Sequence, residues 1–178
     1  IARRSISSTA PSWTSSARVP YLRRTGRRFV VVARTREAVD GLVPLVPEPV
    51  LQRHSSAALE TVISPSLGAV FYVNASSGNN QMVRHSRLTH VYLGHGDSDK
   101  PPSYNPTHRM YDQVFAAGPA AIERYAAHGV RVDTSRFVVV GRPQVEDVEV
   151  VDGPPAAELG RTVLYAPTWR GHVADTAL

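Results

Sequence analysis

Short apolar runs rich in β-branched and aromatic residues recur along this chain and alternate with segments that carry helix signals. Thr35-Arg36-Glu37 has the capping residue and early acid of a helix start. Gly118-Pro119 opens a segment that ends at His128-Gly129, with proline early and glycine last. Alternating strands and helices predict parallel βαβ units, and therefore an α/β fold that binds ligands at the carboxyl ends of its strands. The apolar runs are residues 29–34, 69–73, 89–93, 111–117 and 137–141.

The first 28 residues differ from the rest in charge, because they hold seven arginines and no acidic residue. They are also rich in Ser and Thr and almost aperiodic, which predicts a disordered or juxtamembrane arm over residues 1–28. An anionic membrane surface would attract such an arm by about 1 kcal/mol for each basic residue near the headgroups. The arginines are Arg3, Arg4, Arg18, Arg23, Arg24, Arg27 and Arg28.

The remaining chain divides at a stretch rich in proline and acidic residues. Residues 29–142 carry the alternating pattern and predict a Rossmann-like domain. Residues 143–160 contain three prolines and five acidic residues, which is typical of a domain linker. Residues 161–178 start with a fresh apolar run and predict the first strand of a second α/β domain. Since the chain opens on Ile1 and stops shortly after this run, we interpret it as a piece of a longer protein.

Composition excludes several functions. The chain has no cysteine, so disulfides, thiolate metal sites and cysteine nucleophiles are excluded. No apolar run approaches the roughly 20 residues that a membrane-spanning helix needs. The net charge is +5, yet no aromatic interleaving or RNA-binding signature accompanies the basic residues, so nucleic acid is not an expected partner.

Lys100 is the single lysine among 20 basic residues, and it closes the loop that follows the apolar run 89–93. Gly94 and Gly96 allow a sharp turn beside a ligand, which predicts that His95 is displayed at the edge of a cleft. An imidazole with an unperturbed pKa near 6.5 can act as a general base at neutral pH. Lys100 adds a compact positive charge suited to a phosphate.

Two other interpretations of this loop remain open. It could be a Gly-Asp-rich turn that holds a satisfied histidine and an ordinary surface lysine. Asp97-Ser98-Asp99 also matches the Asp-x-Asp pattern with which many nucleotide-sugar transferases hold a divalent metal. A zinc site is not expected, because the interval of five between His85, His90 and His95 does not place them on one helical or strand face.

Four segments taken in order resemble the CDP-glycerol glycerophosphotransferase family, which comprises primases and polymerases of teichoic-acid-like wall polymers. That family typically shows a His-Gly-Thr-Pro-Leu-Lys stretch, a Gly-aromatic-Pro turn and a Tyr-Ala-Pro-Thr-Trp strand exit. This chain departs from it at Asp97-Ser98-Asp99, which replaces Thr-Pro-Leu, and at Arg142, where many members have an aromatic residue. The segments are Phe71-Tyr72-Val73-Asn74, His95-Gly96-x3-Lys100, Tyr111-Asp112 through Ala117-Gly118-Pro119, and Gly141-Arg142-Pro143 followed by Leu164-Tyr165-Ala166-Pro167-Thr168-Trp169-Arg170.

The resemblance implies a GT-B-type fold of two Rossmann-like domains, with this chain supplying the amino-terminal, acceptor-side one. It implies transfer of glycerol or ribitol phosphate from a CDP-polyol to the terminal hydroxyl of a lipid-linked polymer, with release of CMP and His95 as general base. It implies no metal and no cofactor, an anionic membrane surface as a partner at the cytoplasmic face of the plasma membrane, and leaves self-association open. The residues expected to bind substrate or phosphate are Gly96, Asp97, Asp99, Lys100, Arg142, Thr168 and Arg170.

Two alternatives to this function arise from the same residues. One is a metal-dependent nucleotide-sugar glycosyltransferase that uses Asp97 and Asp99. The other is a non-catalytic module that recruits a membrane-bound polymer complex through the arginine-rich arm. The second alternative predicts that replacing His95 by alanine leaves function intact.

Overall fold

The computed structural model of the chain describes residues 3–8, 18–94, 97–146 and 148. Its contacts divide into two compact units, residues 1–146 and residues 147–178. All described residues except Val148 belong to the first unit. The predicted second-domain strand at 161–166 and most of the predicted linker at 143–160 lie outside the described residues.

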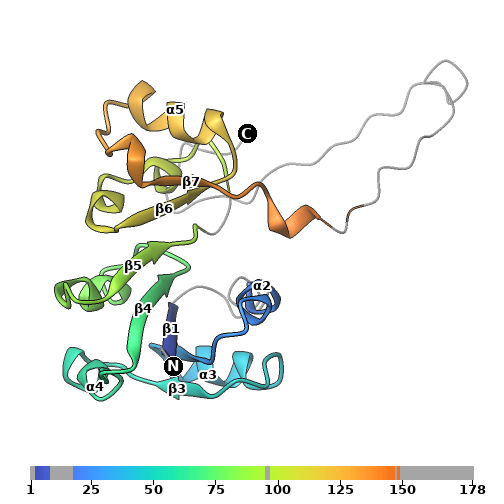
Figure 1. Cartoon of the computed structure of the whole chain (residues 1–178), viewed down its shortest axis with the longest axis vertical. Helices are drawn as coiled ribbons and strands as arrows, with labels where there is room; N and C mark the ends of the chain where they lie inside the picture. Colours follow the sequence, from blue (N-terminus) through green and yellow to red (C-terminus); the bar gives the residue numbers. More distant parts are fainter. Residues whose placement is uncertain (1–2, 9–17, 95–96, 147, 149–178) are drawn as a thin grey trace, which may run out of the picture. The chain divides into compact units, whose positions relative to one another are not determined.

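The described part of the first unit contains a parallel sheet of seven strands in the order β3-β2-β1-β4-β5-β6-β7 (Figure 1). Every neighbouring pair of strands is parallel, as the alternation of strands and helices predicts. This α/β arrangement confirms the predicted fold class for the amino-terminal unit. The strands are β1 (Arg3–Ser8), β2 (Phe29–Ala33), β3 (Val50–Gln52), β4 (Leu67–Tyr72), β5 (Thr89–Tyr92), β6 (Gln113–Ala116) and β7 (Phe137–Val139).

Short helices connect the strands, and local sequence signals fix several of their ends. The Thr35 hydroxyl accepts a hydrogen bond from the Ala38 amide, and the Ser55 hydroxyl accepts one from the Ala58 amide. The longest α-helix of the described residues starts on Pro119, and Gly129 follows it with a φ of 69°, the asymmetry seen in the sequence. The α-helices are α2 (Val19–Arg24), α3 (Arg36–Leu42), α4 (Ser56–Glu60) and α5 (Pro119–Ala127).

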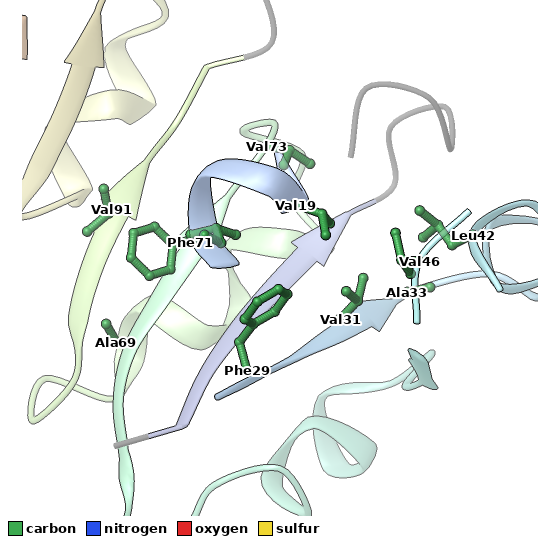
Figure 2. Packing of buried hydrophobic residues seen from close by; sticks show 11 residues of the cluster. Val19, Phe29, Val31, Ala33, Leu42, Val46, Ala69, Phe71, Val73 and Val91 are labelled. Carbon is green, nitrogen blue, oxygen red and sulfur yellow. The ribbon is translucent and has the colours of Figure 1, made fainter. Parts of the chain in front are cut away.

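The core has two hydrophobic clusters, one on each face of the sheet. Along β4 the side chains alternate, so that Phe71 joins one cluster while Val70 and Tyr72 join the other. Figure 2 shows the cluster that includes Phe71, Phe29 of β2 and Val19 of α2. Burial on both faces explains why the strands appear in the sequence as continuous apolar runs rather than alternating ones.

The prediction of disorder over residues 1–28 is wrong for the described residues of that segment, while the juxtamembrane location stays a prediction. Residues 3–8 form β1, which pairs with β2 on one side and β4 on the other. In α2, Val19 and Leu22 are buried in the core. The arginine-rich sequence does not predict this structure, for two reasons. Strand pairing satisfies the backbone N–H and C=O groups whatever the side chains are. In addition, two buried apolar residues are enough to hold so short a helix on the core.

A buried polar cluster ties β4 to β5. The Tyr72 hydroxyl lies 2.8 Å from Nδ1 of His90, and Nε2 of His90 lies 3.1 Å from the His85 carbonyl oxygen. A carbonyl can only accept, so Nε2 carries the proton and Nδ1 accepts from Tyr72. Burial lowers the pKa of His90, against opposing effects of the His85 carbonyl and the Asp112 charge, so the neutral ring is the folded form.

Proline at position 7 should disrupt the sheet, because Ser7 pairs with Val32 and Tyr72 in the middle of it. We expect Ser7→Pro to lower the free energy of unfolding by about 1–3 kcal/mol or more, or to prevent folding, because it removes a ladder hydrogen bond. Ser7→Ala keeps the backbone amide and should stay within about 1 kcal/mol of wild type. Urea unfolding followed by circular dichroism measures both, and equal stability of the two variants would contradict the central position of β1.

Acid should destabilise the fold partly through His90. The unfolded state binds a proton at an ordinary pKa of 6.5 while the folded state resists it, so stability is lost as pH falls from about 6.5 toward the lower folded pKa. His90→Gln should reduce the loss of unfolding free energy between pH 7.5 and 5.5, because glutamine does not titrate. His54→Gln, the same substitution at an exposed position, is the matched control. An unchanged pH dependence in His90→Gln would refute this role.

Candidate functional site

A cavity of about 530 Å³ lies at the carboxyl ends of β4 to β7. Its volume falls in the range of small-molecule binding sites, and its position is the usual one for open α/β sheets. Helix α2 forms a further wall through Tyr21 and Leu22, and Arg18 lines the cavity just before this helix. From the strand ends come Phe71, Leu93, Gly94, Phe115, Ala116, Ala117, Val140 and Gly141, and the lining is completed by Thr25, Asp97, Arg142, Pro143, Val145 and Glu146.

The loop predicted to carry the catalytic base opens onto this cavity. Gly94 follows β5 with a φ of 65°, a conformation that favours glycine. Both Gly94 and Asp97 line the cavity, so the chain borders it immediately before and after His95-Gly96. His95 and Gly96 themselves lie outside the described residues, as do Thr168 and Arg170.

The acidic residues of the loop are held by an arginine of α5. Arg124 Nη1 donates to Asp97 Oδ1 at 2.5 Å, and Arg124 Nε donates to Asp99 Oδ1 at 2.8 Å. Arg124 is only 14% exposed and Asp97 26%, whereas Asp99 is 92% exposed. Burial lowers the pKa of Arg124, but the hydrogen bonds to the two carboxylates outweigh this and raise it. Sequence reasoning did not foresee Arg124 as their partner.

This arrangement bears on the Asp-x-Asp interpretation of the loop. The two carboxylates that would coordinate a metal already share one guanidinium, so a cation would have to compete with the charge of Arg124. Among the described residues, no group of three or more histidine or acidic side chains is placed to hold a metal ion. Lys100, the other predicted phosphate ligand of this loop, is half-exposed, and its amide lies 3.4 Å from the Ser98 hydroxyl.

Arg142 borders the cavity on the β7 side. It follows Gly141, whose φ of 73° turns the chain after the strand. The segment beyond it is tied to α2, since the Tyr21 hydroxyl donates to the Pro143 carbonyl at 2.6 Å and lies 3.1 Å from Glu146 Oε2. Arg142 is exposed beside the cavity. The residue after it, Pro143, is held by the hydrogen bond from Tyr21.

Arg18 is a cavity residue that the sequence analysis missed. It is 9% exposed and lines the cavity just before α2 begins. Burial lowers its pKa, opposed by the electrostatic effect of Tyr92. The sequence showed it as one of seven arginines in a supposed arm, and nothing in the local pattern separates it from the exposed ones.

Comparisons with known proteins support the fold. No protein-family model matches the chain, and no curated protein matches its sequence. A glycosyltransferase from Rickettsia africae is similar in structure, with a TM-score of 0.56, 13% identity, and coverage of 79% of this chain and 43% of that one. HepE of Anabaena, solved with UDP and glucose, gives a TM-score of 0.52 and 13% identity over 79% of this chain and 44% of its own.

These similarities establish the fold class. The described unit is a GT-B-like Rossmann-like domain of the kind found in glycosyltransferases, and the chain spans less than half the length of the two solved structures. Because sequence identity is only 13%, the similarity concerns the fold. No helix among the described residues has the length and apolar character needed to cross a bilayer.

Removing Arg124 should release the loop without unfolding the domain. Exposed or half-exposed ion pairs stabilise by about 1 kcal/mol or less, so Arg124→Met should change the unfolding free energy little. Faster hydrogen exchange should appear at residues 97–100, because both carboxylates lose their partner. Arg36→Met, which removes an exposed pair with Asp40 on α3, is the matched control. Unchanged exchange in Arg124→Met would show that the pair does not hold the loop.

Proposed function

We propose that this chain is the acceptor-side domain of an enzyme that transfers a polyol phosphate, glycerol phosphate in the first instance, from a CDP-polyol to a membrane-linked wall polymer. The observation that carries the proposal is the cavity at the carboxyl ends of β4 to β7, which Gly94 and Asp97 border on either side of His95-Gly96. The order of motifs supports the choice of donor, and the GT-B-like fold supports group transfer from a nucleotide.

In the proposed reaction, His95 takes the proton from the terminal hydroxyl of the acceptor. The acceptor oxygen then forms a bond to the phosphorus that carries the polyol, the bond from that phosphorus to the CMP oxygen breaks, and CMP leaves with the electron pair. Such reactions depend mainly on positioning and on neutralising phosphate charge. Lys100 and Arg142 are the proposed phosphate partners among the described residues, with Gly96, Thr168 and Arg170 completing the set.

Asp97 and Asp99 have a different role in this proposal from the one expected from the sequence. A carboxylate repels a phosphate, and both carboxylates are hydrogen bonded to Arg124. We therefore assign them to positioning the loop that carries His95 and Lys100. In the same proposal, the enzyme works at the cytoplasmic face of the plasma membrane, where a lipid-linked acceptor would be available.

A second candidate is glycosyl transfer from a nucleotide sugar. HepE, which shares the fold, was solved with UDP and glucose, and this favours a sugar nucleotide as the alternative donor. The same cavity would then hold a sugar acceptor, and His95 would again act as base. The pairing of Asp97 and Asp99 with Arg124 disfavours the metal-dependent form of this candidate.

Replacing His95 should abolish turnover in the full-length protein that contains this chain. We expect His95→Ala to lower the rate of CMP release from CDP-glycerol with a lipid-linked acceptor by on the order of 100-fold or more, as for loss of a general base. The control is His54→Ala, an exposed histidine that does not line the cavity. Both variants are compared with wild type at matched thermal stability.

Three other results would contradict the role of His95 or favour another function. Undiminished CMP release in His95→Ala would remove this residue from the mechanism. Release of UDP from UDP-glucose, without CMP release from CDP-glycerol, would favour the second candidate. Release of neither nucleotide by the wild-type protein would favour a recruiting module.

A further inference from the structure

Arg18 carries a buried positive charge at the wall of the cavity. The side chain is 9% exposed, and it lines the cavity together with Leu22 of α2 and Phe71 of β4. Its Nε is fully buried and has no hydrogen-bond partner within the described part of the chain. A guanidinium stays protonated in proteins, so a full positive charge lies at this wall of the cavity.

None of the anionic groups near the cavity compensates this charge. Asp97 is paired with Arg124, and no ion pair involves Arg18 among the described residues. Glu146 is exposed and lies beside the Tyr21 hydroxyl. Tyr92 interacts electrostatically with Arg18, but burial raises the pKa of its phenol to about 12, so it is neutral at physiological pH. A buried charge normally has a partner, because removing it from water is unfavourable.

The rest of the cavity indicates what the partner is. Beside Arg18 its walls are largely apolar, with Leu22, Phe71, Leu93 and Phe115 among them. The volume of about 530 Å³ admits a small organic molecule rather than an inorganic ion alone. Arg142 lines the same cavity and is a second cation for a group that carries more than one negative charge.

We infer that Arg18 is an anion-binding residue of this cavity and that its ligand is the phosphate group of a small organic phosphate ester. The planar fork of a guanidinium matches two oxygens of a phosphate, and such charge-assisted bonds are about twice as strong as neutral ones. The inference deepens the proposed function and rests on it for the identity of the ester, since polyol phosphates carry this group. The anion site itself rests on the burial of Arg18, its place in the cavity lining and the lack of an ion-pair partner for it among the described residues.

A purely structural role for Arg18 makes the opposite prediction for stability. If the side chain only packed the core, its loss would destabilise the unliganded protein. If it awaits an anion, Arg18→Met removes an uncompensated buried charge while keeping a flexible apolar side chain of similar length. The unliganded variant should then unfold at the same temperature as wild type or a higher one, and only binding should suffer.

The test measures binding of sn-glycerol 3-phosphate to the full-length protein by isothermal titration calorimetry and by the ligand-induced shift in melting temperature. We expect Arg18→Met to weaken binding by on the order of 10-fold or more. Arg18→Lys, which keeps the charge but not the fork, should fall between Arg18→Met and wild type. Exposed Arg28, which does not line the cavity, gives the matched control Arg28→Met, with wild-type affinity expected.

Two further probes define the ligand class. Glycerate, which carries a carboxylate in place of the phosphate ester, should bind more weakly than sn-glycerol 3-phosphate. Equal or tighter binding of glycerate would overturn the assignment to phosphate. Inorganic phosphate should bind detectably but more weakly than the ester, because it leaves the apolar walls uncovered.

The inference is overturned if wild type does not bind sn-glycerol 3-phosphate, or if Arg18→Met binds it as tightly as wild type. If Arg18→Met does not fold, the affinity of Arg18→Lys for sn-glycerol 3-phosphate is the test. Wild-type affinity of Arg18→Lys would contradict a role for the guanidinium fork. CMP release measured on the same proteins separates this inference from the proposed function. Binding lost in Arg18→Met, in a protein that releases no CMP, would support the anion site and reject the polyol-phosphate transfer.

Discussion

The pairing of residues 3–8 between β2 and β4 is the interaction on which the rest of this structure depends. β1 lies between β2 and β4 in the sheet. Without it, the strands β3-β2 would not be hydrogen bonded to the strands β4-β5-β6-β7. On the same core, α2 contributes Val19 and Leu22, and Arg18, which comes just before α2, lines the cavity. The residues that stabilise the sheet and the residues of the site are therefore neighbours.

Much of the sheet could be predicted from the sequence, because strands buried on both faces leave a plain signal. The apolar runs that begin near Phe29, Ala69, Thr89 and Phe137 all contain strands, and the helix that starts at Pro119 follows its proline and glycine signals. β1 could not be predicted in the same way. Its sequence Arg-Arg-Ser-Ile-Ser-Ser has one apolar residue, and its position is determined by backbone pairing with strands far away in the sequence.

The candidate site was predictable as a loop but not as a cavity. Gly94 and the strand before it indicated where ligands approach, and Asp97 and Arg142 do line the cavity. The partnership of Arg124 with Asp97 and Asp99 joins residues separated by 27 and 25 positions, so no local pattern could reveal it. Burial of Arg18 is likewise a tertiary property, and the high arginine content hid this residue among exposed neighbours.

The charged side chains in and near the cavity differ in whether they have a partner. Arg124 pairs with both carboxylates of the acidic loop, and this leaves Arg18 and Arg142 as the cations that line the cavity without a carboxylate partner among the described residues. The most direct measurement is a crystal structure of the full-length protein with sn-glycerol 3-phosphate bound. We predict phosphate oxygens about 2.7–2.9 Å from the Arg18 guanidinium, inside the cavity at the strand ends. A phosphate bound elsewhere, with Arg18 contacting only protein, would contradict this account of the site.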